Sequence, residues 1–188
     1  PYRGFHVFMR SLPTLLTERP SAQILIVGKE GVSYGAHPTD GMSWRQRFVN
    51  EIFPKLDDSQ RSRVHFLNTI PYDRFISLLQ VSRVHVYLTY PFVLSWSLLE
   101  AMSVGCAVVA SDTQPLREAI THNETGVLVD FFDAEALANA TIELLNNQEM
   151  RIRLSEAARM FAKAHYDLKT VCLPKQMSWV LNDSVKDS

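Results

Sequence analysis

The sequence predicts the α/β class, with a doubly wound parallel sheet and helices on both of its faces. Runs of four or five apolar residues are typical of strands that are buried on both faces. Segments with helical spacing separate these runs, and such alternation is typical of a doubly wound sheet. The chain has 188 residues, 46% of them hydrophobic, enough for one domain with a core of its own. The predicted strands lie at residues 23–27, 63–67, 86–89, 107–110 and 126–129.

Apolar side chains at helical spacing predict the helices. Ser43 and Asp133 are suited to cap a first helical turn, and Pro115 fits the first turn of another helix. Gly105 ends a Ser-led helix that contains the sequence LLEAM. The other predicted helices span residues 4–17, 44–53, 72–80, 115–120 and 168–181. Two more are predicted before the last of these: one begins at residue 134 and includes Leu137 and Leu144, and one lies around residues 150–161.

Composition and charge exclude several classes of function. The formal net charge is −1, so the sequence shows no basic footprint for a nucleic acid. Cys106 and Cys172 have neither the spacing of metal ligands nor that of a redox pair. We therefore expect Cys106 to lie in the core. With no other thiols in the chain, we also expect the protein to be in a reducing, cytoplasmic location. The longest apolar run, about Val86 to Leu99, contains Pro91 and is too short to span a bilayer. Peripheral contact with the inner face of a membrane stays open.

A ligand site is expected at the carboxyl edge of the sheet, where doubly wound proteins bind ligands. Gly28, Asn68, Thr89 and Ser111 would lie at this edge. The loop from residue 90 to 97 enters a helix there, with Ser95 or Ser97 as its cap, and a helix start of this kind attracts anions.

Glu100 is a single acid among apolar residues, and an ionised carboxylate is costly to bury alone. It therefore either faces solvent on the outer side of its helix or points toward a polar ligand. Arg3 precedes another helix at a position where a guanidinium could bind a phosphate pair. Trp44 and Trp96 are predicted to be packing aromatics, with Trp96 as a possible wall of a sugar pocket.

Two further segments of the sequence resemble a known family. The segments PFVLSWSLLEAMSVGCAVVASDTQPLREAI and ETGVLVDFFDAEALANA resemble the carboxyl-terminal domain of retaining glycosyltransferases of family 4, which have GT-B architecture. Arg3-Gly4, LIVGKE around Gly28 and RVHFLNTI before Pro71 extend the resemblance to about residues 3–165. It implies a Rossmann-like domain, the C-terminal half of a GT-B enzyme, that binds a nucleotide diphosphate sugar.

The resemblance also implies a role for each matching position. Glu100 would bind the ribose hydroxyls, Arg3 the diphosphate, and the backbone of Ile70 the base. The amides of the loop Phe92, Val93, Leu94 and Ser95 would face the sugar and the phosphates. Sugar transfer would proceed with retention, without cofactor or divalent metal, and would serve polysaccharide or glycoconjugate synthesis. The full set of expected donor-binding residues is Arg3, Gly4, Gly28, Ile70, Phe92, Val93, Leu94, Ser95 and Glu100.

Position 92 departs from the family pattern, because Phe92 stands where the family has its first glutamate. Three interpretations stay open: another residue binds the sugar, the donor sugar is unusual, or the domain binds a nucleotide without transferring a sugar. The alternative functions are a non-catalytic nucleotide-binding module and a sugar-nucleotide epimerase of the same architecture.

The expected domain spans residues 1–181, followed by a frayed tail at 182–188. We expect the sequence to be a fragment that lacks an N-terminal acceptor domain and the first strand of the sheet. The missing strand would leave an apolar gap, through which the fragment could self-associate.

Overall fold

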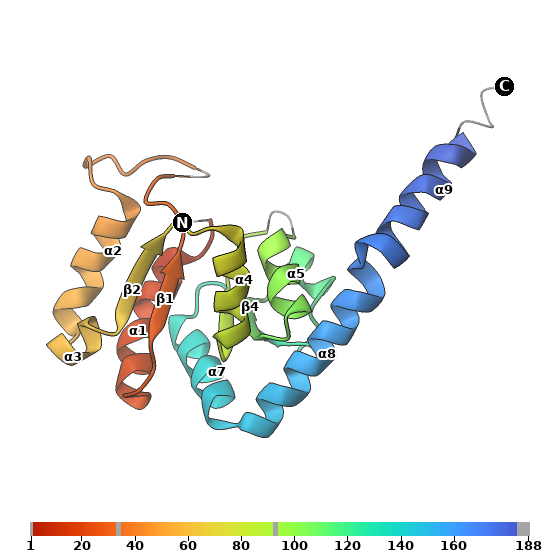
Figure 1. Ribbon diagram of the computed structural model, residues 1–188. Coiled ribbons are helices and arrows are strands. Elements are labelled where there is room, and N and C mark those ends of the chain that lie inside the picture. Colours follow the sequence, from red (N-terminus) through yellow and green to blue (C-terminus); the bar gives the residue numbers. More distant parts are fainter. Residues whose placement is uncertain (1, 33–34, 92–93, 184–188) are drawn as a thin grey trace.

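The structure, a computed structural model, describes residues 2–32, 35–91 and 94–183. Helices surround two small parallel sheets (Figure 1). In the first sheet β1 (Ile24–Val27) pairs with β2 (Val64–Asn68). In the second, β4 (Ala107–Ser111) lies between β3 (Val84–Tyr87) and β5 (Val127–Val129). The α/β class is therefore confirmed, and all five predicted strands are present within two residues of their expected bounds.

The strands do not form one continuous sheet. In the described part of the chain, no strand pairs with the edges of β1 and β3 that remain open. Leu25 and Val27 of β1 are 42% and 37% exposed. A doubly wound order places its first strand between these two edges, so the predicted gap would fall here. Self-association through the gap stays a prediction.

Both faces of β4 are covered, because its side chains point alternately into two cores. Val108 and Ala110 pack with one core, and Ala107 and Val109 with the other. The first core also contains residues of α4 (Tyr72–Val81), α5 (Trp96–Ser103), α6 (Gln114–Arg117) and α8 (Gln148–Tyr166). The second contains residues of α1 (Phe5–Glu18), α7 (Ala134–Asn146) and α8. The predicted covering of both faces is confirmed.

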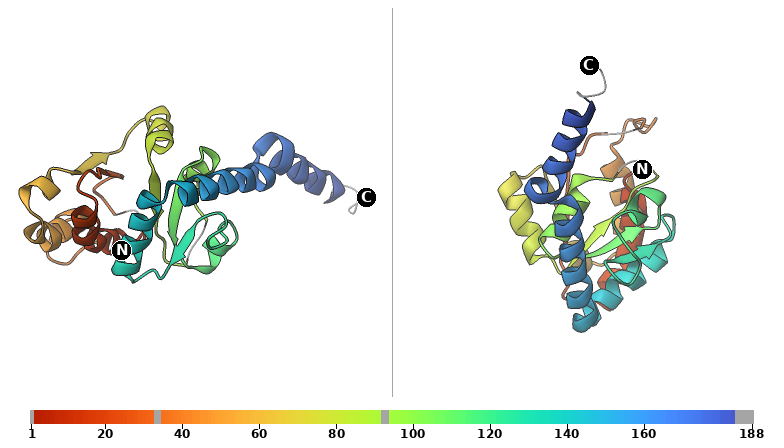
Figure 2. Two further views of the ribbon diagram at one scale, coloured as in Figure 1. Left: turned by 90° about the horizontal axis from the view of Figure 1, so that it is seen from below. Right: turned by 90° about the vertical axis from the view of Figure 1, so that its right-hand side faces the viewer.

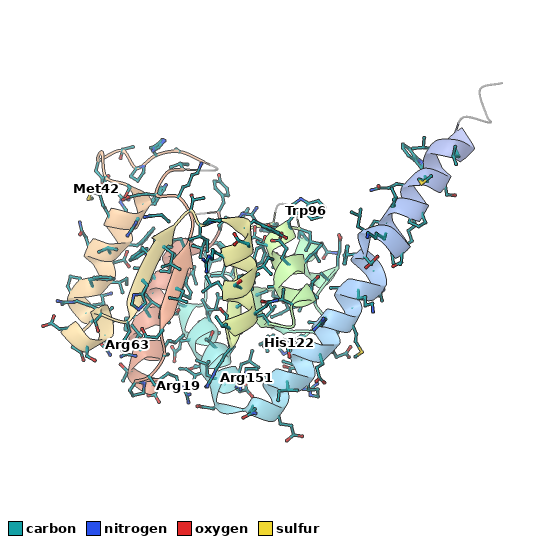
Figure 3. All side chains as sticks on the ribbon, in the orientation of Figure 1. Arg19, Met42, Arg63, Trp96, His122 and Arg151 are labelled. Carbon is teal, nitrogen blue, oxygen red and sulfur yellow. The ribbon has the colours of Figure 1, made fainter. Side chains whose placement is uncertain are left out.

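A third core joins the smaller sheet to α1 and to α2 (Trp44–Ile52). Ser43 caps α2 as predicted, since its hydroxyl accepts from the Gln46 amide while the Gln46 side chain returns to the Ser43 amide. Arg63 precedes β2 and is buried beneath the end of α1, where Figure 3 labels it near Arg19.

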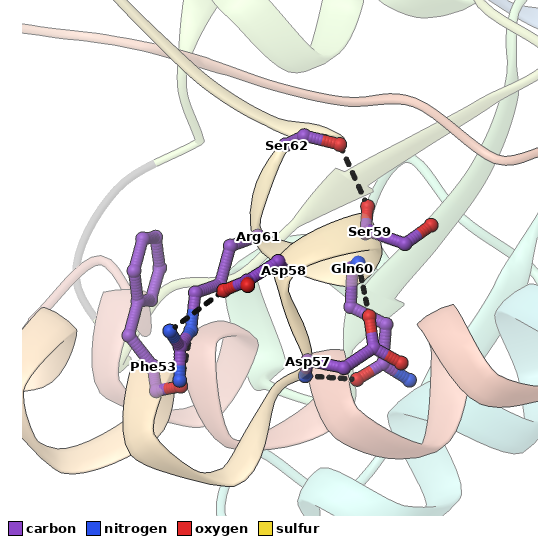
Figure 4. Close-up of polar contacts among 7 residues, drawn as sticks. All are labelled: Phe53, Asp57, Asp58, Ser59, Gln60, Arg61 and Ser62. Atoms are coloured by element: carbon purple, nitrogen blue, oxygen red, sulfur yellow. Dashed lines mark hydrogen bonds and ion pairs between the residues drawn. The ribbon is translucent and has the colours of Figure 1, made fainter.

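Two short elements between α2 and β2 were not predicted: η1 (Phe53–Lys55) and α3 (Asp58–Arg61). Figure 4 shows the contacts that hold α3. The Asp57 carboxylate accepts from the Gln60 amide at 2.7 Å, and the Gln60 side chain accepts from the Asp57 amide. Arg61 donates to the Phe53 carbonyl at 2.9 Å, which ties α3 to η1. The spacing of Asp57 and Gln60 is that of a capping box, a signal that the sequence contained.

The segment that follows α8 forms an arm that leaves the body of the molecule (Figures 1 and 2). The predicted final helix begins as a short π-helical segment, η2 (Leu168–Cys172), and continues as α9 (Leu173–Asp183). Several apolar side chains of α9 are exposed: Leu173, Met177, Trp179, Val180 and Leu181. Among the described residues, no helix combines the length and the apolar character needed to cross a bilayer.

Candidate functional site

The predicted site residues gather along one edge of the molecule. Figure 1 shows the N-terminus and the starts of α4 and α5 along its upper side. Helices α4 and α5 follow β2 and β3, so this is the edge formed by the carboxyl ends of the strands. Two expected site residues, Phe92 and Val93, lie outside the described residues.

Arg3 lies against the end of β3. Its guanidinium donates a 2.6 Å hydrogen bond to the hydroxyl of Tyr87, and the same nitrogen is 3.4 Å from the hydroxyl oxygen of Thr89. The guanidinium carbon is also 5.9 Å from the centre of the Tyr87 ring. The contacts place a fixed positive charge at the carboxyl end of β3, an edge strand of the second sheet.

Gly4 is the N-cap residue of α1 and has a left-handed conformation, with φ of 65°. A Cβ atom at this position would lie 2.3 Å from the Cβ atom of Leu88. Glycine is therefore required here for two independent reasons, backbone angle and close approach. This close packing brings the start of α1, and with it Arg3, against the segment that follows β3.

Gly28 and Asn68 meet where β1 and β2 end. The Gly28 amide donates to the Asn68 carbonyl at 2.9 Å, and both residues have positive φ. Asparagine tolerates the left-handed region better than most residues, which explains how Asn68 adopts a φ of 54° here. A Cβ atom at Gly28 would meet nothing within 4 Å, so this residue borders open space.

Arg45 is a residue of this edge that sequence reasoning missed. Its guanidinium lies 4.0 Å from the centre of the Phe66 ring and donates to the Asn68 side chain at 3.0 Å. Glu30 lies 3.9 Å from the same guanidinium. The contacts join the end of β2 to α2, and no spacing in the sequence could have indicated them.

The start of α5 differs from its predicted form in one respect. Ser95 occupies the N-cap position, but its side chain makes no capping hydrogen bond. Instead the hydroxyls of Ser95 and Ser97 lie 3.1 Å apart and bond to each other. The preceding residue, Leu94, packs against the core beside α5. Ser95 therefore stands at the predicted N-cap position without a capping hydrogen bond from its side chain, and neither hydroxyl occupies the amides of the first turn.

Glu100 is half-buried in the second turn of α5, and Tyr72 lies beside it. A side-chain hydrogen bond to Glu100 raises the pKa of the Tyr72 phenol above its ordinary value, and burial and the negative charge of Glu100 add to this shift. Ile70 lies two residues before Tyr72, in the connection from β2 to α4. The expected base-contacting and ribose-contacting positions therefore lie on adjacent elements.

The two tryptophans have opposite environments. Trp44 stacks on Phe48 with ring centres 5.9 Å apart, as expected of a packing aromatic. Trp96 is 82% exposed at the upper end of α5 (Figure 3). Its predicted packing role is therefore wrong, and an indole ring stands exposed beside the expected donor loop.

Ser111 has a structural role at this edge. It is fully buried, and its hydroxyl accepts from the Thr89 amide at 3.0 Å and donates to the Thr89 carbonyl at 2.9 Å. The hydroxyl thereby extends the pairing of β3 with β4. The next residue, Asp112, forms a two-point ion pair with Arg117, and this hydrogen-bonded partner lowers the pKa of the carboxyl.

Two ionisable groups, His85 of β3 and Cys106 directly before β4, are held neutral by burial. Burial lowers the pKa of His85 to about 4, and its Nε2 atom has no hydrogen-bond partner. Burial also raises the pKa of the Cys106 thiol to about 12, which confirms Cys106 as a core residue. Among the described residues, no three His, Cys, Asp or Glu side chains are grouped so that they could hold a metal ion.

Comparison with known proteins matches most of the chain to one family. A sequence model of the family described as glycosyl transferases group 1 matches residues 1–161. D-inositol 3-phosphate glycosyltransferase of Corynebacterium urealyticum is 28% identical over 160 residues, which cover 85% of this chain and 36% of the relative. Phosphatidyl-myo-inositol mannosyltransferase of Mycolicibacterium smegmatis is 27% identical over 91% of this chain and 40% of the relative. The chain thus spans well under half the length of these relatives.

Solved structures share the fold. Anabaena Alr3699/HepE in complex with UDP-glucose has a TM-score of 0.77 at 19% identity, over 97% of this chain and 46% of that protein. The C-terminal domain of a group 1 glycosyl transferase family protein (LpcC) from Francisella tularensis has a TM-score of 0.76 at 18% identity. That match covers 89% of this chain and 82% of the other. The fold is therefore that of a GT-B C-terminal domain.

Proposed function

Because the chain belongs to the glycosyl transferases group 1 family, we propose that it is the donor-binding domain of a sugar-transferring enzyme. Its substrate is a nucleotide diphosphate sugar, and the sugar passes to an acceptor held by a further domain. The anomeric configuration is retained, and the product belongs to polysaccharide or glycoconjugate synthesis. The observation that carries the proposal is the presence of Arg3 and Glu100 at one edge of a GT-B fold.

The diphosphate would bind between Arg3 and the start of α5. Arg3 offers a guanidinium whose position is fixed by Tyr87, and a guanidinium can donate two parallel hydrogen bonds to phosphate oxygens. Neither Ser95 nor Ser97 caps the first turn of α5, so its amides can donate to an anion.

The nucleoside would bind between α4 and α5. Glu100 supplies carboxylate oxygens, which accept well from a vicinal diol such as that of ribose. The base would lie against the backbone at Ile70, in the connection before α4. Half-burial of Glu100 favours this role over that of a solvated surface acid.

Catalysis by such a site is mainly electrostatic. The bond between the anomeric carbon and the diphosphate oxygen breaks, an acceptor oxygen bonds to the same face of the sugar, and the acceptor proton passes to a base outside this domain. Negative charge grows on the departing diphosphate, and Arg3 with the α5 amides stabilises that charge. Arg3 supplies positive charge at this position, so we propose a reaction that needs no divalent metal.

The sugar end of the site is the part that the family pattern describes least well. Phe92 cannot accept a hydrogen bond from a sugar hydroxyl, although the family places a glutamate there. This one observation favours a second candidate, a nucleotide-binding module without transfer activity. Turnover by the full-length protein, with a nucleotide diphosphate sugar and an acceptor, distinguishes the two.

The donor site is tested by isothermal titration of the chain with UDP, GDP, ADP and their diphosphate sugars in the presence of EDTA. We expect at least one of them to bind. We also expect Glu100→Ala and Arg3→Ala each to weaken that binding at least tenfold. Glu143→Ala, at an exposed helical position on α7, and Arg83→Ala, at an exposed position before β3, are the matched controls. The proposed site is wrong if none of these compounds binds, or if the controls weaken binding as much as the site variants do.

A further inference from the structure

Four aromatic side chains meet at the carboxyl edge of the second sheet, and none of them belongs to the expected donor-binding set. Tyr90 follows β3, and Phe131 and Phe132 follow β5, so the parallel strands bring these segments to one edge. The ring of Tyr90 packs edge-to-face with the rings of Tyr2 and Phe131, at centre-to-centre distances of 6.2 Å and 6.0 Å. The Phe131 ring lies 4.9 Å from the Phe132 ring. The four rings therefore form one contiguous row.

Three of the four rings reach the solvent. Tyr2 is 50% exposed, Tyr90 47% and Phe132 68%, whereas Phe131 is buried in the core that contains Val129. Core packing explains the position of Phe131. It does not explain three large exposed rings in one row, and a contiguous apolar surface of this kind is typical of a binding site. Tyr2, Tyr90 and Phe132 together are termed the aromatic platform.

The aromatic platform is held in place by the protein itself. The Tyr90 amide donates to the Tyr2 carbonyl at 2.8 Å. Gly35, in the loop after β1, approaches the Tyr2 ring so closely that a Cβ atom there would lie 2.5 Å from it. Phe131 anchors the other two rings to the core. Aromatic side chains that are already fixed lose little conformational freedom when a ligand binds.

Hydrogen-bonding groups border the aromatic platform. The exposed Asp130 accepts a 2.8 Å hydrogen bond from the Phe132 amide, which holds its carboxylate next to this ring. An ionised carboxylate has about four acceptor positions, and the Phe132 amide uses one of them. The phenol groups of Tyr2 and Tyr90 can both donate and accept. The platform therefore combines flat apolar faces with polar groups at their borders.

We propose that the aromatic platform binds a saccharide, namely a sugar unit of the acceptor, and so orients the acceptor toward the donor site. The acceptor role rests on the proposed function. A pyranose has a face of C–H groups that packs on the negatively charged face of an aromatic ring, and its hydroxyls bond to carboxylate and phenol oxygens. Tyr2 directly precedes Arg3, so the platform lies next to the group that would bind the donor diphosphate.

The charges near the aromatic platform favour a saccharide over a lipid surface. Asp130 and Asp133 are both exposed and stand on either side of Phe131 and Phe132 in the sequence. These carboxylates would be repelled by the negative surface of a membrane. A hydrocarbon chain would also leave the carboxylate and phenol groups without partners, whereas a sugar uses them.

Saturation-transfer NMR tests the saccharide site on the chain and on the full-length protein. The probes are the neutral tetrasaccharides maltotetraose, cellotetraose and mannotetraose. We expect at least one of them to bind, with the strongest transfer to C–H protons on one pyranose face. Tyr90→Ala and Phe132→Ala should each weaken the tightest of these probes about three- to tenfold.

A matched control separates the platform from aromatic side chains in general. Trp179→Ala removes a ring on α9 that is as exposed as Phe132, and it should leave the affinity within about twofold. Urea denaturation checks that each variant is folded. The saccharide site is wrong if none of the probes binds, or if Trp179→Ala weakens binding as much as the platform variants do. Binding to the chain but not to the full-length protein would show that the further domain covers the platform, and would also overturn the inference.

The saccharide site and the donor site fail in different ways. Nucleotide binding is measured separately and depends on Arg3 and Glu100. If a nucleotide binds and no tetrasaccharide does, the inference about the platform is wrong and the proposed function stands. If a tetrasaccharide binds through the platform and no nucleotide binds, the saccharide site stands, while the donor site and the acceptor role built on it are wrong.

Discussion

The guanidinium of Arg3 donates a hydrogen bond to the hydroxyl of Tyr87 across a sequence separation of 84 residues. The backbone supports the same contact, since the Tyr90 amide donates to the Tyr2 carbonyl at 2.8 Å. The first residues of the described chain are thus fixed on the segment that leaves β3. In the proposed function, this contact orients the charge that meets the diphosphate.

Replacement of Gly4 tests how tightly this segment is packed. Gly4→Ala forces a side chain into the left-handed region and against Leu88, so we expect the free energy of unfolding to fall by about 2–4 kcal/mol. Urea denaturation measures the change. Gly31→Ala is the control, because a Cβ atom there meets nothing within 4 Å and we expect a change below about 0.5 kcal/mol. Equal losses of unfolding free energy in Gly4→Ala and Gly31→Ala would show that the close approach of Gly4 to Leu88 is not the cause.

Removal of the Arg63 guanidinium should destabilise the join between α1 and β2. The guanidinium is buried and donates to the carbonyls of Leu16 and Arg19, at 3.0 Å each. Arg63→Ala leaves these acceptors without a partner, so we expect a loss of about 2–4 kcal/mol in urea denaturation. Arg83→Ala changes an exposed arginine that precedes β3 in the same way, and it should cost little. A comparable loss in both variants would show that burial of Arg63 is not the cause.

His85 should give the folded state a particular dependence on pH. Its pKa is about 4 in the folded protein and near its ordinary value of 6.5 in the unfolded chain, so the unfolded chain binds the proton more readily. The contribution of His85 is complete above pH 6.5 and is lost as the pH falls toward 4. We expect His85→Leu to reduce the slope of unfolding free energy against pH in this range.

His37→Ala, in the exposed loop after β1, should leave that slope unchanged. Stability curves for the parent chain and His85→Leu that run parallel between pH 4 and 6.5 would contradict the role of His85.

The two cysteines should differ strongly in reactivity. Burial raises the pKa of Cys106 to about 12, so at neutral pH almost no thiolate forms there, whereas Cys172 is partly exposed. We expect Ellman's reagent to label Cys172 rapidly in the native chain and Cys106 only after unfolding. Cys172→Ser should make the native chain nearly unreactive, and rapid labelling of that variant would show that Cys106 is accessible.

Local sequence predicted the regular elements because the signals for them lie within a few neighbouring residues. The apolar run Ala107–Ala110 predicted β4, and the serine at position 43 predicted the start of α2. The capping pair Asp57 and Gln60 is equally local, and it was missed only because it lies in a polar connection.

The sequence by itself determined the α/β class, the bounds of the strands within two residues, and the family-like motif that contains Glu100. Tertiary structure alone decided which side chains meet: Arg3 with Tyr87, and Arg45 with Phe66. It also decided that Trp96 is exposed and that Arg63 is buried. The physical reason is the range of the interactions. Periodicity and capping act between residues that are close in sequence, whereas burial and the positions of charged side chains depend on segments that only packing brings together.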